Sequence, residues 1–212
     1  MEYNYIVVEG NIGAGKTSLV KMISKQYNAR MILEQFADNP FLPKFYKDQE
    51  RYSFPLELSF LADRYRQLKT KLGDQDLFTS FTISDYYFMK SLIFAKSTLA
   101  DDEFRLYRQI FNIIYQSLPR PGLYVYLHLD VEKLLYNINC RGRDYEKSIT
   151  AEYLKKIQMG YFEFFKQETD MKILVVDTCN VDFVNKNDDY ENLISTIFDK
   201  KYDKGINRVV LQ

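Results

Sequence analysis

The sequence of 212 residues predicts an α/β fold, built as a five-stranded parallel sheet with helices on both faces. Two observations lead to this fold class. Short apolar runs rich in β-branched and aromatic residues alternate along the chain with longer segments of helical periodicity, an order typical of parallel sheets covered on both sides. The hydrophobic content of 46% supports one sizeable core, and no stretch has the composition of an interdomain linker.

Five short apolar runs are predicted strands. They are Tyr5–Val8, Arg30–Leu33, Leu77–Ile83, Tyr124–Leu129 and Lys172–Val176. Seven segments in which apolar residues recur every three or four positions are predicted helices. They are Lys16–Tyr27, Phe54–Leu72, Tyr87–Lys96, Asp101–Leu118, Val131–Cys140, Ala151–Gln167 and Tyr190–Phe198. We expect one domain at residues 1–200, and the pattern leaves open whether the tail at 201–212 packs on it.

Charge and cysteine content limit the kind of partner. Lys and Arg together number 29, and so do Asp and Glu, so no net charge attracts nucleic acid or an anionic membrane surface. Cys140 and Cys179 lie far apart without a metal-ligand spacing. The sequence shows neither a signal peptide nor an apolar stretch of membrane-spanning length, so we expect a reducing, cytoplasmic location.

The first predicted strand runs directly into a segment with the pattern G-x-x-x-x-G-K-[ST] of phosphate-binding loops. Its glycines let backbone N–H groups face the β- and γ-phosphates of a nucleoside triphosphate. Lys16 adds a positive charge, the Thr17 hydroxyl can ligate Mg²⁺, and the following helix points its positive end at the same anion. The residues predicted to bind the triphosphate are Gly10, Asn11, Ile12, Gly13, Ala14, Gly15, Lys16, Thr17 and Ser18.

Further charged side chains follow the strands and a later helix. Glu34 and Asp85 come after the second and third predicted strands, where parallel sheets bind their ligands. Arg141 and Arg143 flank a glycine in the last third of the chain, and guanidinium groups bind phosphoryl oxygens bidentately. Together with the phosphate loop, these arginines predict a lid that neutralises charge during phosphoryl transfer.

These features resemble those of the deoxyribonucleoside kinases, the deoxycytidine, deoxyguanosine and deoxyadenosine kinase family, and most closely the bacterial deoxyadenosine and deoxyguanosine kinases. The likeness runs from Tyr5 to about Phe198. Its landmarks are Gly10–Thr17, Glu34, Asn39-Pro40-Phe41-Leu42, Phe45-Tyr46, Phe54 and Arg64, Ile93-Phe94-Ala95, Arg141-Gly142-Arg143, Glu146 and Asp182-Phe183. The resemblance implies a P-loop kinase fold with an arginine-bearing lid. It also implies transfer of the γ-phosphate of ATP, with Mg²⁺, to the 5′-hydroxyl of a purine deoxyribonucleoside in nucleotide salvage.

The resemblance also implies roles for single residues. Glu34 matches the general base that accepts the proton of the 5′-hydroxyl. Tyr46 and Glu146 match the pair that holds the sugar 3′-hydroxyl, and Phe94 matches the ring that stacks on the base. Arg64 matches an arginine that contacts the base. Asp182 and Phe183 match a loop beside the adenine of ATP.

The sequence departs from the family's acid-Arg-Ser triplet after the third strand. It has Ser84-Asp85-Tyr86 there, so the usual arginine is missing. Asp85 takes the acidic, Mg²⁺-side place in one register, whereas a gap-free alignment from Phe94 puts Ser84 there. We hypothesise that Lys90, one turn along a helix that opens at Asp85, restores the positive charge.

A second departure concerns the base. Glu57 stands where the family commonly has a base-reading glutamine. An ionised carboxylate only accepts hydrogen bonds, which suits the adjacent N1–H and N2–H donors of guanine. A Glu57 neutralised by burial, or paired with Arg64, keeps adenine open. Because the segment Asp38-Asn39-Pro40-Phe41-Leu42 resembles the purine branch, we expect deoxyadenosine first and deoxyguanosine next.

A third departure is Asn137, which stands where the family tends to carry another lid arginine. Two alternative functions remain open at this point. One is a nucleoside monophosphate kinase of the thymidylate kinase type, for which Arg64 and Arg66 would bind a second phosphate. The other is an ATP-binding regulatory module without transfer activity. The resemblance also implies a homodimer, for which Phe54–Tyr65 and Phe88–Phe94 supply either an interface or core.

Overall fold

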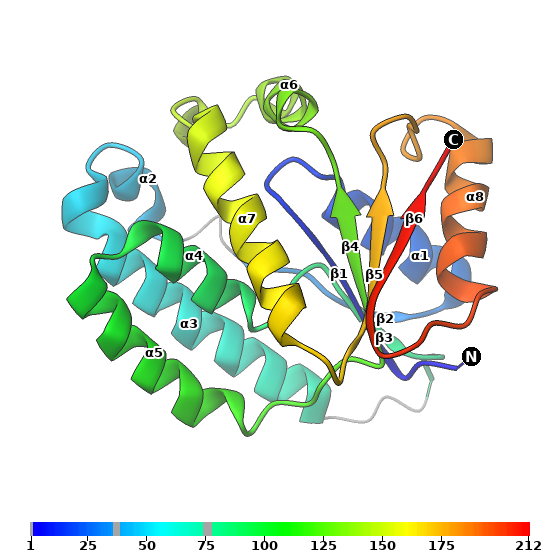
Figure 1. Cartoon of the computed structure of the whole chain (residues 1–212), viewed down its shortest axis with the longest axis horizontal. Helices are drawn as coiled ribbons and strands as arrows, with labels where there is room; N and C mark the ends of the chain where they lie inside the picture. The colour runs from blue at the N-terminus through cyan, green and yellow to red at the C-terminus, as the bar shows by residue number, and fades with distance from the viewer. Residues whose placement is uncertain (1, 36–38, 74–77) are drawn as a thin grey trace.

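The computed structural model describes residues 2–35, 39–73 and 78–212, which form a three-layer α/β structure (Figure 1). The strands are β1 (Tyr5–Gly10), β2 (Arg30–Ile32), β3 (Thr82–Ser84), β4 (Leu123–His128), β5 (Lys172–Asp177) and β6 (Gly205–Val210). The helices are α1 (Lys16–Tyr27), α2 (Leu42–Phe45), α3 (Gln49–Gly73), α4 (Lys90–Thr98), α5 (Asp101–Tyr115), α6 (Val131–Arg141), α7 (Ala151–Gln167) and α8 (Asn187–Phe198). A short 3₁₀ helix follows α6 at Asp144–Glu146.

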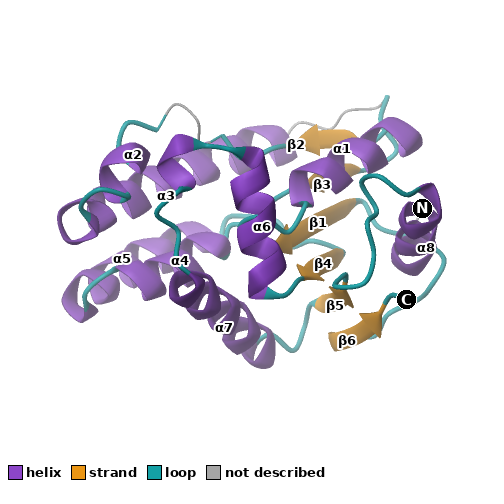
Figure 2. Cartoon of the chain, turned by 90° about the horizontal axis from the view of Figure 1, so that it is seen from above, coloured by secondary structure: helices purple, strands orange, loops and turns teal. Residues whose placement is uncertain are grey.

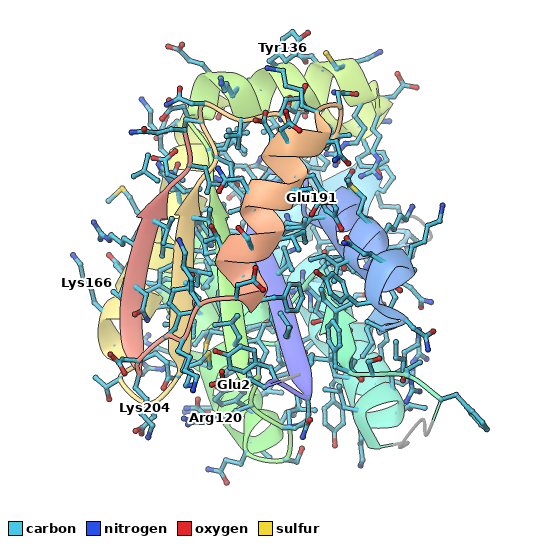
Figure 3. All side chains as sticks on the ribbon, turned by 90° about the vertical axis from the view of Figure 1, so that its right-hand side faces the viewer. Glu2, Arg120, Tyr136, Lys166, Glu191 and Lys204 are labelled. Carbon is cyan, nitrogen blue, oxygen red and sulfur yellow. The ribbon has the colours of Figure 1, made fainter. Side chains whose placement is uncertain are left out.

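The six strands form one sheet in the order β2-β3-β1-β4-β5-β6, and every pair is parallel. Helices α1 and α8 cover one face, and α3, α4, α5 and α7 lie on the other (Figure 2). Figure 3 looks onto the α8 side, with Glu191 on α8 facing the viewer and Tyr136 on α6 above the sheet. The predicted fold class is therefore confirmed.

The strand count was wrong, because the sheet has six strands and not five. The tail beyond residue 200 contributes β6, which pairs in parallel with β5. Along β6, half-buried and exposed residues alternate, as expected of a strand at the edge of a sheet. Such a strand has no continuous apolar run, so the criterion that found the buried strands missed it.

The two faces of β4 explain the aromatic composition. Leu123, Val125 and Leu127 belong to the core beneath α1 and α8. Tyr124 and Tyr126 point to the opposite face, where the Tyr126 ring packs 5.1 Å from Phe165 of α7. Period-two alternation on a strand buried on both sides thus places aliphatic side chains in one core and aromatic side chains in the other.

Several predicted boundaries differ from the structure. Helix α3 begins at Gln49 and continues through Pro55, whereas the predicted helix began at Phe54. Helix α2 was not predicted. The third strand was predicted at Leu77–Ile83; Leu77 lies outside the described residues, and the observed strand is Thr82–Ser84.

Helix α4 begins at Lys90 and not at Tyr87. The backbone N–H of Tyr87 donates instead to a carboxylate oxygen of Glu9 in β1, at 2.9 Å. This bond and the burial of Tyr86, Tyr87 and Phe88 hold the segment before α4 against the sheet in a non-helical conformation. Among the described residues, none of the helices combines the length and apolar character needed to span a bilayer.

Candidate active site

Two cavities meet at the carboxyl ends of the central strands. Helix α6 lies above these strand ends (Figure 1). One cavity extends along the phosphate loop toward α6 and the segment after β5. The other reaches between α2, α3, α4 and α7. They share a wall formed by Gly13, Lys16, Thr17, Glu34, Asp85, Arg141 and Arg143. The residues predicted from the sequence to bind phosphate, to act as the general base and to form the lid therefore lie where the two cavities meet.

The phosphate loop connects β1 to α1 in a tight turn. Gly13 and Gly15 have φ values of 86° and 85°, which side chains rarely adopt. The Lys16 ammonium donates to the carbonyl oxygens of Gly10 and Asn11, at 3.0 and 2.8 Å. Asn11 is buried, and its amide donates to the carbonyl of Leu154 in α7, so this side chain anchors the loop.

Gly15 also packs against the segment after β5. A Cβ added at Gly15 would lie 2.7 Å from the ring of Phe183. Phe183 is buried, whereas Asp182 is exposed and accepts hydrogen bonds from the backbone and side chain of Asn185. Both residues line the cavity that extends along the phosphate loop. Phe183 lies beside the loop, and Asp182 shapes the turn that it forms with Asn185.

Gly15→Ala is therefore expected to lower Tm and to weaken ATP binding. The added methyl group collides with Phe183, and the left-handed backbone costs about 1–3 kcal/mol for a non-glycine residue. Thermal melting and ATP titration measure the two effects. Gly73→Ala is the matched control, since no atom of the part of the chain that the structure describes lies within 4 Å of its added Cβ. Equal Tm values for the two variants would contradict this prediction.

Asp85 connects the phosphate loop to Glu34. One carboxylate oxygen accepts from the Thr17 hydroxyl at 2.5 Å, and the other accepts from the backbone N–H of Glu34 at 2.8 Å. Ser84 points away from the loop and bonds to Tyr5 and to the carbonyl of Tyr86. Asp85 and not Ser84 is therefore the acidic residue that faces Thr17. The hydroxyl and carboxylate oxygens are the ligand types that suit Mg²⁺.

Glu34 forms ion pairs with two buried cations. Arg64 donates from Nε and Nη2 to Oε1 at 2.8 and 2.6 Å, and the Lys90 ammonium donates to Oε2 at 2.6 Å. Burial raises the pKa of Glu34, but Lys90 and Arg64 outweigh burial and bring that pKa to about 2. Glu34 is thus a carboxylate at neutral pH. Lys90 reaches Glu34 from the first residue of α4, and not from a helix that opens at Asp85. That Lys90 replaces the missing arginine stays a hypothesis.

The second cavity is lined by apolar and aromatic side chains from α2, α3, α4 and α7, together with charged side chains. Phe94 lies on its wall with the Lys90 ammonium 5.4 Å from the ring centroid. Glu57 is buried on the same wall, and its Oε1 accepts from Thr98 at 3.1 Å. Arg64 also donates from Nη1 to the Ser91 hydroxyl at 2.8 Å, and among the described residues no hydrogen bond joins its guanidinium to Glu57.

The lid residues gather on Glu146, which is 6% exposed. Arg141 donates to one carboxylate oxygen of Glu146, from Nε at 3.0 Å and from Nη2 at 2.5 Å, and Arg143 donates to the other at 3.2 Å. Gly142 between them has a φ of 70° and ends α6. Tyr46 stacks on Tyr145 beside this group, and burial together with Glu146 raises the pKa of the Tyr46 hydroxyl.

Two polar residues support the site through contacts that the sequence analysis did not predict. Glu9, one residue before the phosphate loop, is fully buried and accepts from the Tyr87 N–H and the Tyr161 hydroxyl, each at 2.9 Å. An acidic residue in an otherwise apolar strand was the available signal. Asn137, in the place of a third lid arginine, donates to the carbonyl of Gly13 at 2.9 Å.

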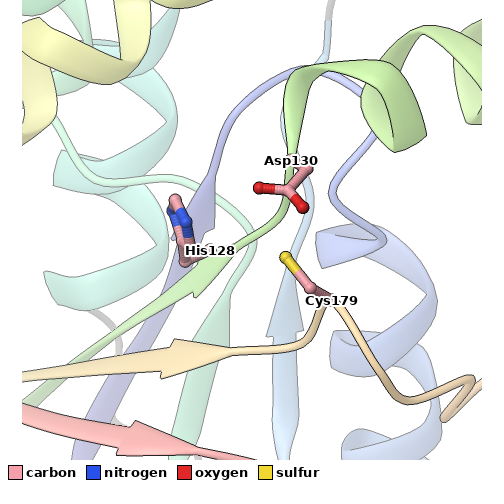
Figure 4. A group of neighbouring side chains, drawn as sticks. All are labelled: His128, Asp130 and Cys179. Carbon is pink, nitrogen blue, oxygen red and sulfur yellow. The ribbon is translucent and has the colours of Figure 1, made fainter.

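A separate group of possible metal ligands lies near the ends of β4 and β5. Ligand atoms of His128, Asp130 and Cys179 all lie within 4.8 Å of one another (Figure 4). Gln158 bonds to the Nδ1 atom of His128 at 2.9 Å. Imidazole and thiol are ligands for zinc-like metals and not for Mg²⁺, so this group is chemically distinct from the Thr17 and Asp85 pair.

The fold and the site together define a class. A phosphate loop, two acidic residues beside it (Glu34 and Asp85) and an arginine lid at the carboxyl edge of a parallel sheet are the parts of a P-loop phosphotransferase. A family model described as deoxynucleoside kinase matches residues 6–202, and the chain belongs to this family. It is therefore an ATP-dependent deoxynucleoside kinase.

The relatives differ in the nucleoside for which they are named. Deoxyguanosine kinase of Bacillus subtilis (strain 168) is 35% identical over 91% of this chain and 95% of its own length. Deoxyadenosine/deoxycytidine kinase of the same organism is 28% identical over 91% and 90%. A solved structure of deoxyadenosine kinase from M. mycoides, with dCMP and a flexible dCDP bound, matches with a TM-score of 0.80 at 25% identity, covering 92% of this chain and 100% of that one.

Proposed function

We propose that this kinase transfers the γ-phosphate of ATP to the 5′-hydroxyl of a purine deoxyribonucleoside, giving the 5′-monophosphate in nucleotide salvage. The observation that carries the proposal is the shared wall of the two cavities. The phosphate loop lies on one side of Glu34, and on the other lies the slot that has Glu57 and Phe94 on its wall, here called the base slot. A nucleoside in the slot and a triphosphate on the loop would meet at this carboxylate.

Each group of residues on the shared wall has a separate role in the phosphate transfer. The loop amides and Lys16 bind the triphosphate, and Thr17 and Asp85 would hold Mg²⁺, which when bound neutralises charge on the β- and γ-phosphates. Glu34 accepts the hydrogen bond of the 5′-hydroxyl and then its proton. Although a carboxylate with a pKa of about 2 is a weak base, a loose transition state releases this proton late, so orientation matters more than basicity.

The acceptor is held by the remaining predicted residues. Tyr46 and Glu146 would bind the sugar 3′-hydroxyl at the base of the lid, and Phe94 would stack on the purine. Arg64 acts through Glu34, to which it is bonded, and less through the base. Both purines are proposed acceptors: the segment that includes Asn39-Pro40-Phe41-Leu42 favours adenine, although its Asp38 lies outside the described residues, and the buried Glu57 favours guanine.

Lys90→Met is expected to reduce kcat by about 10²-fold, the scale of misplacing a reacting group. Loss of this cation leaves Glu34 held by Arg64 alone and raises the pKa of Glu34, so the acid limb of the pH–rate profile moves to higher pH. Lys90→Arg supplies the cation that the family usually has and should restore most of kcat. A profile unchanged in Lys90→Met would show that Lys90 does not hold Glu34.

An acceptor panel tests the proposed reaction. Purified protein, Mg²⁺ and labelled ATP are offered deoxyadenosine, deoxyguanosine, deoxycytidine, thymidine, dTMP and dAMP. We expect phosphorylation of the two purine deoxynucleosides and little of the others. Transfer confined to pyrimidine nucleosides, or to monophosphates, would contradict the proposal.

The two alternative functions have less support. A monophosphate kinase needs free arginines for the acceptor phosphate, but Arg64 is bonded to Glu34 and Ser91, and Arg66 is exposed and paired with Asp63. A regulatory module that transfers no phosphate does not require a carboxylate such as Glu34, which two cations orient between two cavities. Membership of the deoxynucleoside kinase family agrees with neither alternative.

The proposal extends to a homodimer in the cytoplasm. Apolar side chains are exposed on neighbouring helices, with Leu106 and Ile113 of α5 exposed by 50% and 78% and Leu58 of α3 by 37%. A second copy of this surface would cover them. The aromatic Phe88, in contrast, stacks on Phe111 in the core. The free thiols of Cys140 and Cys179 fit a reducing compartment.

A further inference from the structure

Glu57 has one carboxylate oxygen without a partner in the base slot. The residue lies on α3 and is 2% exposed. Its Oε1 accepts from Thr98, whereas Oε2 is buried without a hydrogen-bond partner among the described residues. A buried carboxylate oxygen left unpaired is costly, so such an atom on a cavity wall is a candidate for ligand contact.

The positively charged groups around Glu57 form their hydrogen bonds with other residues. On α3 itself, Arg64 is bonded to Glu34 and Ser91. On α4, Lys90 is bonded to Glu34, and Thr98 supplies a neutral hydroxyl. The remaining titratable groups that act on Glu57 from elsewhere in the fold are Glu34 after β2, Tyr46 after α2, Tyr107 of α5 and Tyr153 of α7.

No cation in the described residues is bonded to Glu57, so its charge is poorly compensated. Burial raises the pKa of Glu57 to about 7, and Arg64 and Thr98 only partly oppose this rise. The free oxygen thus changes from hydrogen-bond donor to acceptor near neutral pH. Guanine and adenine differ in the same sense at ring position N1, where guanine carries a hydrogen-bond donor and adenine an acceptor.

We propose that the proton on Glu57 selects the purine, so that the ionised residue accepts from guanine N1–H and the protonated residue donates to adenine N1. This inference rests on the proposed function and specifies the choice of base within it. Deoxyguanosine binding then releases a proton from Glu57, and deoxyadenosine binding takes one up. Guanine's amino group gives the ionised residue a second donor, and adenine's amino group gives the protonated residue a donor for its other oxygen.

The first test is the ratio of kcat/KM for deoxyguanosine to that for deoxyadenosine, measured from about pH 5.5 to about pH 8.5. The titrations of Glu34 and Lys16 affect both substrates and cancel in the ratio. We expect the ratio to rise about tenfold per pH unit, since the two substrates need opposite protonation states of one group. A ratio that stays constant across this range would overturn the inference.

A variant series assigns the effect to Glu57. Glutamine both donates and accepts at every pH, so Glu57→Gln should favour deoxyadenosine with a ratio independent of pH. Glu50→Gln, at an exposed position in the first turn of the same helix, is the matched control and should keep the pH dependence of the unaltered protein. A pH-dependent ratio that persists in Glu57→Gln would place the switch elsewhere and overturn the inference.

Calorimetric binding separates this inference from the proposed reaction. Titration of each nucleoside near neutral pH, in buffers of different ionisation enthalpy, gives the number of protons exchanged. We expect release with deoxyguanosine and uptake with deoxyadenosine, and exchange of the same sign for both would overturn the role of Glu57. Failure of transfer to any nucleoside would instead overturn the proposed function, and the binding result would still decide the role of Glu57.

Discussion

Glu34→Gln is expected to reduce kcat by about 10³-fold with ATP and a purine deoxynucleoside, within the range for removal of a general base. Among the described residues, Glu34 and Asp85 are the acidic members of the shared wall, and the two oxygens of Asp85 are already bonded to Thr17 and to the backbone of Glu34. Glutamine keeps the size of the side chain but turns one oxygen into a donor, which cannot take the proton of the 5′-hydroxyl.

The same substitution leaves Arg64 and Lys90 buried beside a neutral amide, so a loss of stability accompanies the loss of activity. ATP binding separates the two effects, because the hydrogen bonds of the Glu34 carboxylate go to Arg64 and Lys90 and not to the phosphate loop. We expect the ATP Kd to change little while kcat falls, with Tm measured alongside. A kcat within a few-fold of the unaltered protein would show that Glu34 is not the base.

The fold was predictable wherever burial leaves a pattern. The helices Lys16–Tyr27 and Ala151–Gln167 were predicted with the bounds observed, because each has an apolar stripe and a clear start. The edge strand β6 and the start of α4 were not predictable in this way. One is half exposed, and the other is set by the bond between Glu9 and the Tyr87 backbone, which joins residues far apart in the chain.

Residues that line the junction of the two cavities could be selected from the sequence, but the side chains with which they pair could not. The motif and the resemblance selected Lys16, Glu34 and Arg141, and these line the junction of the two cavities. That Arg64 is bonded to Glu34, and that Thr98 meets Glu57, are consequences of how α3 and α4 pack. Partners separated by tens of residues leave no local signal in a single sequence, so pairing requires the structure.

Arg141→Ala and Arg143→Ala are each expected to slow the chemical step by factors on the order of 10²–10³, the scale for losing one donor to transition-state charge. Both guanidinium groups line the wall shared by the two cavities, and Glu146 positions them. With Asn137 in place of a third arginine, these two carry the lid charge predicted from the sequence.

Kinetics distinguish a role in the transition state from a role in binding. If the arginines act on the transferring phosphoryl group, kcat and kcat/KM fall together, whereas losses confined to KM for ATP would mean that they only bind the donor. Arg66→Ala is the matched control, since Arg66 is exposed and pairs with Asp63 at the surface. Removing either lid arginine also removes the hydrogen bonds that it donates to one carboxylate oxygen of Glu146. Because this carboxylate is proposed to hold the sugar 3′-hydroxyl, the KM for the nucleoside should change as well.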